Sequence, residues 1–471
     1  MATARTRARS LVPVLTAYLV LVEFVPSGWV LPSFGDVGTP ANIFALLALI
    51  WYAASWLAGR VRPAAGTGAV RVAMWVFGAA ILLAYLALAE PDRQAVALET
   101  QAADRGLIGF AAWFGVVAIA SSGIRDYAEL QLLLRRMVVY GSFIGGLGII
   151  EFFGSVDLLA RVHIPGLRPS SLTSQLMVRG AYVRPSSNTS QPLELAAVLA
   201  LLLPFALQQA LDPERASSSW SRRWVPVICI GGALPLTVSR TSIIGLAVVL
   251  VLLIPTWPAQ RRWPALGVIA LGVGALKLAV PGLVSTTLGL FASFLGNSDD
   301  STQARTADYA GVAQYIEQRP WFGRGYGTFI PSLYRYTDNM YLLAIVEIGI
   351  VGVLALLGVY LTGWRCARLG RRLTQDPVRR ELGQCFAAAM AAATILSATF
   401  DSLGFPMFAG LFFLLLGLSG AYLGIMRREA AARRAAASAE AAQAAAAAAV
   451  EETEPELWMP VAAGHGVGDG T

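Results

Sequence analysis

Residues 405–426 read FPMFAGLFFLLLGLSGAYLGIM, an apolar run that contains no charged side chain. A helix that crosses the roughly 30 Å hydrocarbon core of a bilayer needs about 20 residues of this kind. Similar runs recur along the rest of the chain, giving about twelve in all. Their ranges are 10–26, 41–59, 70–89, 106–122, 137–154, 192–210, 224–239, 241–257, 264–284, 339–363, 384–402 and 405–426. We therefore predict an all-α protein, a polytopic transmembrane helix bundle of about twelve spans.

The composition of the 471-residue chain agrees with this prediction. Hydrophobic residues make up 56% of the chain and charged residues only 14%, whereas soluble domains contain about 25% charged residues. A cytosolic enzyme, a disordered chain and a nucleic-acid-binding protein are therefore excluded. The chain has two histidines and three widely spaced cysteines, without a disulfide framework or zinc-ligand spacing. We accordingly expect no metal and no cofactor.

The arginines indicate how the spans are oriented. Short connections rich in arginine, such as residues 365–380, alternate with connections that carry few. Because cytoplasmic loops carry an excess of Lys and Arg, we expect the arginine-rich side and both termini to be cytoplasmic. The opposite, outer side has two long connections, residues 155–191 and 285–338, and we expect the outer loops to be partly helical.

These patterns predict two parts of the chain. Residues 1–428 form the transmembrane domain, and residues 429–471 form a cytoplasmic tail. The tail is Ala-rich up to residue 450, which favours a helix. Its end, 451–471, is acidic and then Gly-rich, so we expect disorder there.

Ionisable side chains within the apolar runs test for a transport function, since a charge in mid-membrane is costly and is retained for use. The candidates are Glu23, Glu151, Glu194, Lys277 and Glu347. Most lie within a turn or two of a predicted span end, and they form no series suited to relaying protons. A transporter is therefore the weaker interpretation.

Arg240 is the most informative single residue. It stands between two apolar runs and is flanked by hydroxyl side chains, in the segment Ser239-Arg240-Thr241-Ser242. Such an arginine is expensive unless it meets an anion or lines a wet cavity, and its planar guanidinium fork matches phosphate oxygens. A lipid-linked pyrophosphate would suit it. The alternative is an arginine in a short loop that contacts lipid headgroups.

Several outer-side motifs recur in a fixed order. Arg-Pro-Ser begins at Arg184 and Ser-Arg-Thr-Ser at Ser239; PWFGRGYGTF covers 320–329, DNMYL covers 338–342 and EIGIVG covers 347–352. As an ordered set across roughly residues 180–360, they resemble the O-antigen ligase and polymerase family of bacterial membrane proteins. The resemblance implies a glycosyltransferase that moves a glycan from an undecaprenyl pyrophosphate carrier to an acceptor hydroxyl at the outer face of the cytoplasmic membrane. It implies no nucleotide sugar, metal or other cofactor.

The resemblance also implies roles for individual residues. Arg240 and Arg305 match arginines that act near the pyrophosphate, and Asp338 stands where the family usually has a histidine, so it becomes the candidate base. Alternatively, Asp338 only pairs with Arg305 or Arg335 and stabilises the loop. The candidate substrate-binding residues are Arg184, Arg324, Asn339 and Tyr341.

The same motifs occur in ligases, polysaccharide polymerases and protein O-glycosyltransferases, and we slightly favour a polymerase. The acceptor is accordingly a glycan, lipid or protein hydroxyl, and the surrounding bilayer is the other partner. Two further classes stay open: a transporter or flippase for lipid-linked glycans, and a non-catalytic scaffold of a polysaccharide assembly complex. The sugar, the linkage and the oligomeric state are not specified by the sequence.

Overall fold

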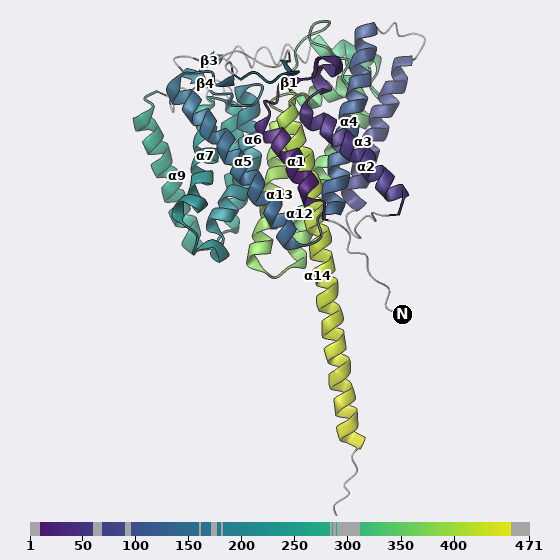
Figure 1. Cartoon of the computed structure of the whole chain (residues 1–471), viewed down its shortest axis with the longest axis vertical. Coiled ribbons are helices and arrows are strands. Elements are labelled where there is room, and N and C mark those ends of the chain that lie inside the picture. Colours follow the sequence, from purple (N-terminus) through teal and green to yellow (C-terminus); the bar gives the residue numbers. More distant parts are fainter. Residues whose placement is uncertain are drawn as a thin grey trace, which may run out of the picture. The chain divides into compact units, whose positions relative to one another are not determined.

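The computed structural model describes residues 10–59, 68–89, 96–159, 162–170, 177–179, 182–282, 285, 289 and 311–453. Every predicted apolar run coincides with a helix, and these helices make up most of the described chain. They are α1 (Val12–Phe24), α2 (Pro40–Leu57), α3 (Gly68–Leu86), α4 (Ala97–Gly123), α5 (Tyr127–Gly154), α6 (Pro192–Leu211), α7 (Trp220–Leu236), α8 (Arg240–Leu253), α9 (Ala259–Ala279), α12 (Met340–Leu373), α13 (Pro377–Leu396) and α14 (Pro406–Thr453). The predicted all-α bundle is confirmed (Figure 1).

Eight of the described helices are long and apolar enough to cross a membrane, and two shorter apolar helices, Val12–Phe24 and Arg240–Thr256, accompany them. The structure therefore indicates a multi-pass membrane protein, while the count of about twelve spans stays a prediction. One predicted range is too long: the run 384–402 ends as a helix at Leu396. The residues that follow Leu396 form a connection, and they contribute to the site described below.

The helices differ in how much protein surrounds them. The most apolar stretch of α14 is entirely buried and that of α6 is 89% buried, whereas the corresponding stretch of α9 is not buried at all. Helix α6 packs against α5, α7, α8 and α13. Because lipid covers apolar side chains as well as protein does, α9 can lie at the periphery with Trp263, Leu271 and Leu278 exposed.

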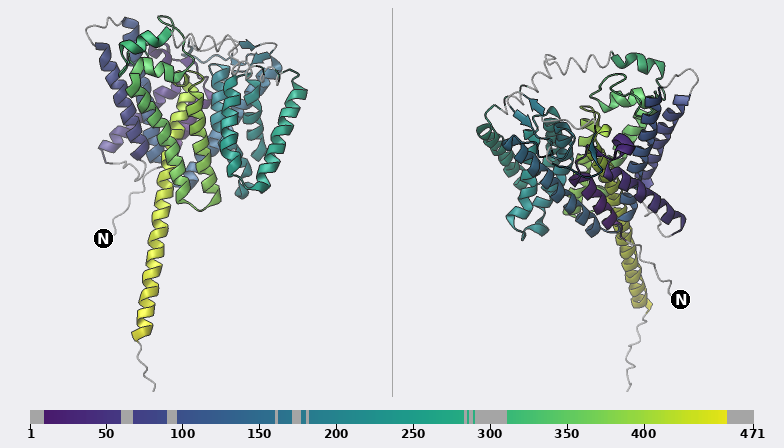
Figure 2. Two further views of the ribbon diagram at one scale, coloured as in Figure 1. Left: turned by 180° about the vertical axis from the view of Figure 1, so that it is seen from behind. Right: turned by 45° about the horizontal axis from the view of Figure 1, so that its top comes forward.

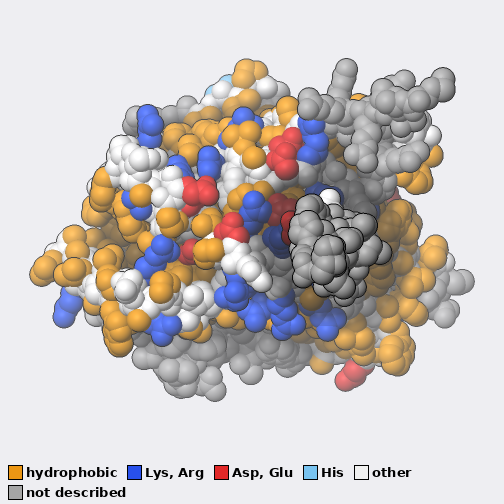
Figure 3. Space-filling model, turned by 90° about the horizontal axis from the view of Figure 1, so that it is seen from below, with side chains coloured by type: hydrophobic (Ala, Val, Ile, Leu, Met, Phe, Trp, Pro, Cys, Tyr) orange, Lys and Arg blue, Asp and Glu red, His pale blue; other side chains and the backbone are white. Residues whose placement is uncertain are grey.

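Two small sheets lie at one end of the bundle (Figures 1 and 2). Strand β1 (Trp29–Val30) pairs antiparallel with β2 (Arg168–Pro169), and β3 (Met177–Arg179) pairs antiparallel with β4 (Tyr182–Arg184). The expected partly helical outer loop agrees with a helical stretch over residues 311–318. Figure 3 views the molecule from the opposite end, where Lys and Arg side chains are spread across the surface. The assignment of that end to the cytoplasm stays a prediction.

Helix α12 is interrupted near its N-terminal third. Gly349 has φ 66° and ψ −171°, which breaks the helical hydrogen-bonding pattern. The segment 320–325 pairs with the broken backbone: Arg324 N donates to Val346 O (3.0 Å), Gly325 N to Glu347 O (2.8 Å), Ile350 N to Pro320 O (2.8 Å) and Val351 N to Trp321 O (3.2 Å). We call this pairing of the segment 320–325 with the broken part of α12 the crossing. Unsatisfied backbone groups are not tolerated at membrane depth, so the crossing makes the interruption possible.

The crossing explains why two sequence motifs accompany each other. A Cβ atom at Gly323 would lie less than 3.0 Å from the backbone of Glu347, and one at Gly349 less than 3.0 Å from the backbone of Trp321. Only glycine allows this approach from both sides. The motifs at 320–329 and 347–352 are therefore two halves of one local structure.

The chain divides into two compact units, Met1–Met426 and Arg427–Thr471. In the second unit, α14 continues to Thr453, and its side chains are exposed from residue 431 to residue 447. The acidic and Gly-rich end that we expect to be disordered, 454–471, lies outside the described residues.

Candidate functional site

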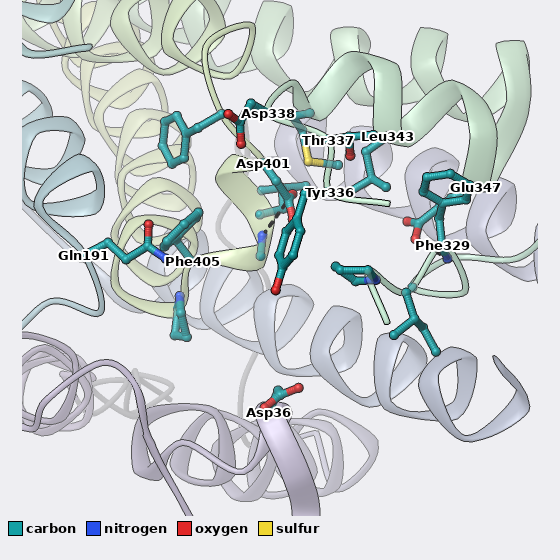
Figure 4. Close-up of a pocket in the computed structure, with 18 of the residues that line it drawn as sticks. Asp36, Gln191, Phe329, Tyr336, Thr337, Asp338, Leu343, Glu347, Asp401 and Phe405 are labelled. Carbon is teal, nitrogen blue, oxygen red and sulfur yellow. Dashed lines mark hydrogen bonds between the residues drawn. The ribbon is translucent and has the colours of Figure 1, made fainter. Parts of the chain in front are cut away.

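A cavity of about 680 Å³ lies at the end of the bundle that carries the small sheets. Its size falls in the range of small-molecule sites in proteins. The lining comes from distant parts of the chain: helix α4, the start of α8, the segment 326–338, and the connection between α13 and α14. Figure 4 shows labelled side chains from the segment 326–338 and from the connection between α13 and α14 directed toward a common space.

Two of the predicted arginines line one wall of the cavity. Arg240 begins helix α8, and its side chain is only 8% exposed, so it does not face the lipid. Arg184, which ends β4, also lines the cavity, and its Nε donates to the Thr237 carbonyl oxygen (2.9 Å). Arg184 thus contacts the α7–α8 turn, next to which Arg240 begins helix α8.

The conformation of this turn explains how Arg240 is placed. Val238 has a left-handed φ of 46°, which is strained for a β-branched residue and is typical of functional sites. The next residue, Ser239, caps α8, and the Ser242 hydroxyl donates to the Ser239 carbonyl oxygen (2.6 Å). The N-terminal end of a helix carries positive partial charge. This wall therefore combines two guanidinium groups with a helix end that favours anions.

Two carboxylates line another part of the cavity. Asp338 is exposed, and Asp401 is half-buried in the connection between α13 and α14. Burial raises the pKa of Asp401 to about 6; the Gly404 N–H donates to this carboxylate and lowers the pKa, and the nearby Asp338 charge raises it. Figure 4 shows the two carboxylates at the same end of the cavity.

The backbone joins the two segments that carry these carboxylates. Met340 N donates to the carbonyl oxygens of Ser397 (2.9 Å) and Phe400 (3.2 Å). Sequence reasoning missed Asp401 because it assigned this residue to a span. The signal that was available is a lone carboxylate in a short Ser- and Gly-containing connection, 397–404, between two apolar helices.

Asn339 and Tyr341 are not among the residues that line the cavity. The Asn339 side chain caps α12, with Oδ1 accepting from Tyr341 N (2.9 Å) and Leu342 N (3.3 Å). The Tyr341 hydroxyl donates to the Thr394 carbonyl oxygen (2.7 Å). Both residues therefore position the segment that carries Asp338.

Arg324 also lies outside the lining. Its Nη2 is 3.5 Å from Glu99 Oε1 and donates to the Tyr334 hydroxyl (2.7 Å), which itself donates to Glu99 Oε1 (2.6 Å). Its guanidinium also lies over the rings of Tyr315 and Tyr334, at 5.0 and 5.1 Å from their centroids. Arg324 thus ties the segment 324–334 to helix α4. Arg305 lies outside the described residues.

Two further arginines line the cavity, Arg105 on helix α4 and Arg335 before Asp338. From the sequence, Arg335 is predicted only as a partner of Asp338, and Arg105 is not singled out. Arg105 lies at the start of a predicted span, where an arginine has no distinguishing pattern.

Of the five ionisable residues considered for transport, Glu194, Glu151 and Glu347 accept hydrogen bonds from backbone amides, whereas the Glu23 carboxylate is buried without a hydrogen-bond partner among the described residues. Glu194 accepts from Ser190 N (2.7 Å), the Ser27 hydroxyl (2.8 Å) and the first amides of α14. Glu151 accepts from Ser186 N (3.1 Å) and Ser187 N (2.6 Å), and Glu347 accepts from Phe329 N (3.1 Å). Lys277 is exposed on the peripheral helix α9. Three of the five candidates therefore anchor the backbone of segments that connect the helices.

Fold and site together define a multi-pass membrane protein with a polar cavity walled by arginines and carboxylates. Residues 225–357 match the family model described as O-antigen ligase. The match agrees with the resemblance that the ordered motifs predict, and it supports a membrane glycosyltransferase of the ligase or polymerase type. No match to a curated protein was found for the chain.

Proposed function

We propose that the protein transfers a glycan from undecaprenyl pyrophosphate to an acceptor hydroxyl, in this cavity and at the outer face of the cytoplasmic membrane. The observation that carries the proposal is the composition of the cavity wall. Arg184, Arg240 and the start of α8 supply positive charge on one side, and Asp338 and Asp401 supply carboxylates on another. A transfer that releases a pyrophosphate and a proton needs both kinds of group.

The arginine wall would bind the pyrophosphate of the donor. As the bond between the anomeric carbon and the pyrophosphate oxygen breaks, negative charge accumulates on that oxygen. Guanidinium groups placed in advance stabilise this charge more than they stabilise the ground state. The leaving group is the lipid pyrophosphate itself, which remains in the membrane.

The carboxylate pair would activate the acceptor. The acceptor oxygen forms the new bond to the anomeric carbon, and its proton passes to the Asp338–Asp401 pair. A base is most effective when its pKa lies near the working pH, and the raised pKa of Asp401 moves this carboxyl group in that direction. An aspartate pair can thus replace the histidine that is usual at position 338.

The test uses the purified protein in lipid nanodiscs, with lipid-linked glycan extracted from membranes of the source organism as donor. Release of undecaprenyl pyrophosphate is measured by mass spectrometry for the wild type, Asp338→Asn and Asp401→Asn. We expect both variants to lose at least about a hundredfold in rate, the usual contribution of a general base. Asp104→Asn is the matched control, since Asp104 accepts from the Tyr85 hydroxyl (2.7 Å) outside the cavity. Wild-type rates in both cavity variants would refute the assignment.

A further inference from the structure

Tyr336 lines the cavity and yet has 77% of its surface exposed. The neighbouring aromatic residues are packed: Tyr334 stacks on Phe329 with ring centroids 4.9 Å apart, and Tyr326 is only 9% exposed. In Figure 4 the Tyr336 ring extends into the middle of the cavity, between the end that carries Asp401 and the wall that carries Asp36. The ring faces are therefore accessible to a ligand in the cavity.

The wall opposite Asp338 and Asp401 carries polar groups of mixed type. Asp36 and Asn42 come from the segment that precedes and begins α2, and Arg105 comes from α4. The Gly35 backbone lies against Arg105, since a Cβ atom at Gly35 would be 2.7 Å from the guanidinium carbon. This contact places the backbone just before Asp36 against Arg105. The wall thus offers carboxylate, amide and guanidinium groups within one small region.

An exposed aromatic ring facing such a wall fits a sugar ring. A pyranose has an apolar face of C–H groups that packs on an aromatic ring, and hydroxyls at its edge that both donate and accept hydrogen bonds. Because Asp36 and Arg105 carry opposite charges, this wall offers a second phosphate no net attraction, and an acyl chain would leave these polar groups without partners. A peptide segment would not need the open aromatic face.

The subsite lies next to the carboxylate pair. Tyr336 precedes Asp338 by two residues in an extended segment that continues into the N-cap of α12. A sugar ring stacked on Tyr336 would therefore present a hydroxyl close to Asp338. Its oxygen would bond to the donor's anomeric carbon, its proton would pass to the carboxylate pair, and undecaprenyl pyrophosphate would leave.

We propose that Tyr336 and Asp36 form an acceptor subsite for a pyranose ring, so that the acceptor is a glycan and not a protein side chain. This inference rests on the proposed function, whose acceptor it specifies. It assigns Tyr336 to acceptor recognition and leaves donor binding to the arginine wall.

The first experiment measures binding without turnover. The glycan is released from its carrier, and its binding to the protein in nanodiscs is followed by saturation-transfer NMR, with no donor present. We expect Tyr336→Ala and Asp36→Ala each to weaken binding about tenfold, and Tyr336→Phe to bind like the wild type. Tyr85→Ala is the matched control, because Tyr85 lies outside the cavity. Unchanged binding in Tyr336→Ala, or loss of binding in Tyr336→Phe, would overturn the subsite.

The second experiment measures transfer with the carrier-linked donor. We expect Tyr336→Ala to raise the KM for the released glycan about tenfold, while the matched control Tyr85→Ala keeps the wild-type KM. A serine-containing peptide offered as acceptor should give no product. Equal use of the peptide would overturn the inference. If binding depends on Tyr336 but the wild type releases no carrier pyrophosphate, the proposed function fails and the sugar subsite stands.

Discussion

Replacing Gly349 by alanine should disrupt the crossing between α12 and the segment 320–325. The conformation at Gly349, with φ 66° and ψ −171°, belongs essentially to glycine, and forcing another residue into it costs about 1–3 kcal/mol. The new methyl group would also meet the Trp321 backbone at less than 3.0 Å. Relieving that overlap would break the hydrogen bonds from Ile350 to Pro320 and from Val351 to Trp321, each worth about 0.5–1.5 kcal/mol. The total destabilisation is about 2–6 kcal/mol.

The same helix provides the control. A Cβ atom at Gly358 would meet nothing within 4 Å, so Gly358→Ala should gain about 0.5–1 kcal/mol from helix propensity. Thermal unfolding of both variants in nanodiscs, followed by tryptophan fluorescence, makes the comparison. We expect Gly349→Ala to unfold several degrees below the wild type and Gly358→Ala at or above it. Equal unfolding temperatures for the two variants would refute the account of the broken helix.

Three further predictions concern the carboxylates. Because the pKa of Asp401 is about 6, the kcat/KM for the acceptor should fall as the pH drops through about 6, where Asp401 becomes protonated. A pH profile that is flat across this range would contradict the role of Asp401 as a base. The raised pKa means that the native state binds more protons than the unfolded state between about pH 4 and pH 6, so Asp401 lowers stability as the pH rises through this window. Asp401→Asn should therefore unfold at a higher temperature than the wild type at pH 7 while losing transfer, and a lower unfolding temperature would show that the charge is stabilising. Finally, Glu194→Ala should leave the buried amides of Ser190 and Met407 without an acceptor, which costs about 1–3 kcal/mol for each amide. The yield of folded protein should therefore drop sharply relative to Glu214→Ala, an exposed control. Equal yields of the two variants would exclude the anchoring role of Glu194.

Much of the fold was predictable because hydrophobic runs of membrane-spanning length depend on local composition alone. All twelve predicted runs coincide with helices. The predicted end of α13 was wrong because the segment from Ser397 to Asp401 contains too few polar residues to interrupt a hydropathy pattern. The break in α12 was not predictable either, since it depends on backbone pairing with a segment about 25 residues earlier in the chain.

The residues of the site likewise divide into those that the sequence predicted and those that it did not. Arg240 was found because it is an isolated charge between two apolar runs, and Asp338 because it stands where the resembling family usually has a histidine; both line the cavity. Arg324 looked equally suitable in sequence, but its guanidinium is taken up by Glu99 and Tyr334. Asp36, Arg105 and Tyr336 carry no local pattern that points to a ligand. These three residues come together only in the folded protein, where α4, the start of α2 and the segment before α12 all line the cavity.

The central claim is that a glycan leaves a pyrophosphate carrier and forms a new glycosidic bond in this cavity. The most direct measurement counts released undecaprenyl pyrophosphate and new glycosidic bonds in the same nanodisc reaction. We predict equal amounts of both from the wild type and from Arg125→Ala, whose exposed arginine pairs with Glu129 (3.2 Å), and neither product from Arg240→Ala. Glycan that crosses the bilayer still attached to its carrier, or full transfer by Arg240→Ala, would contradict the account.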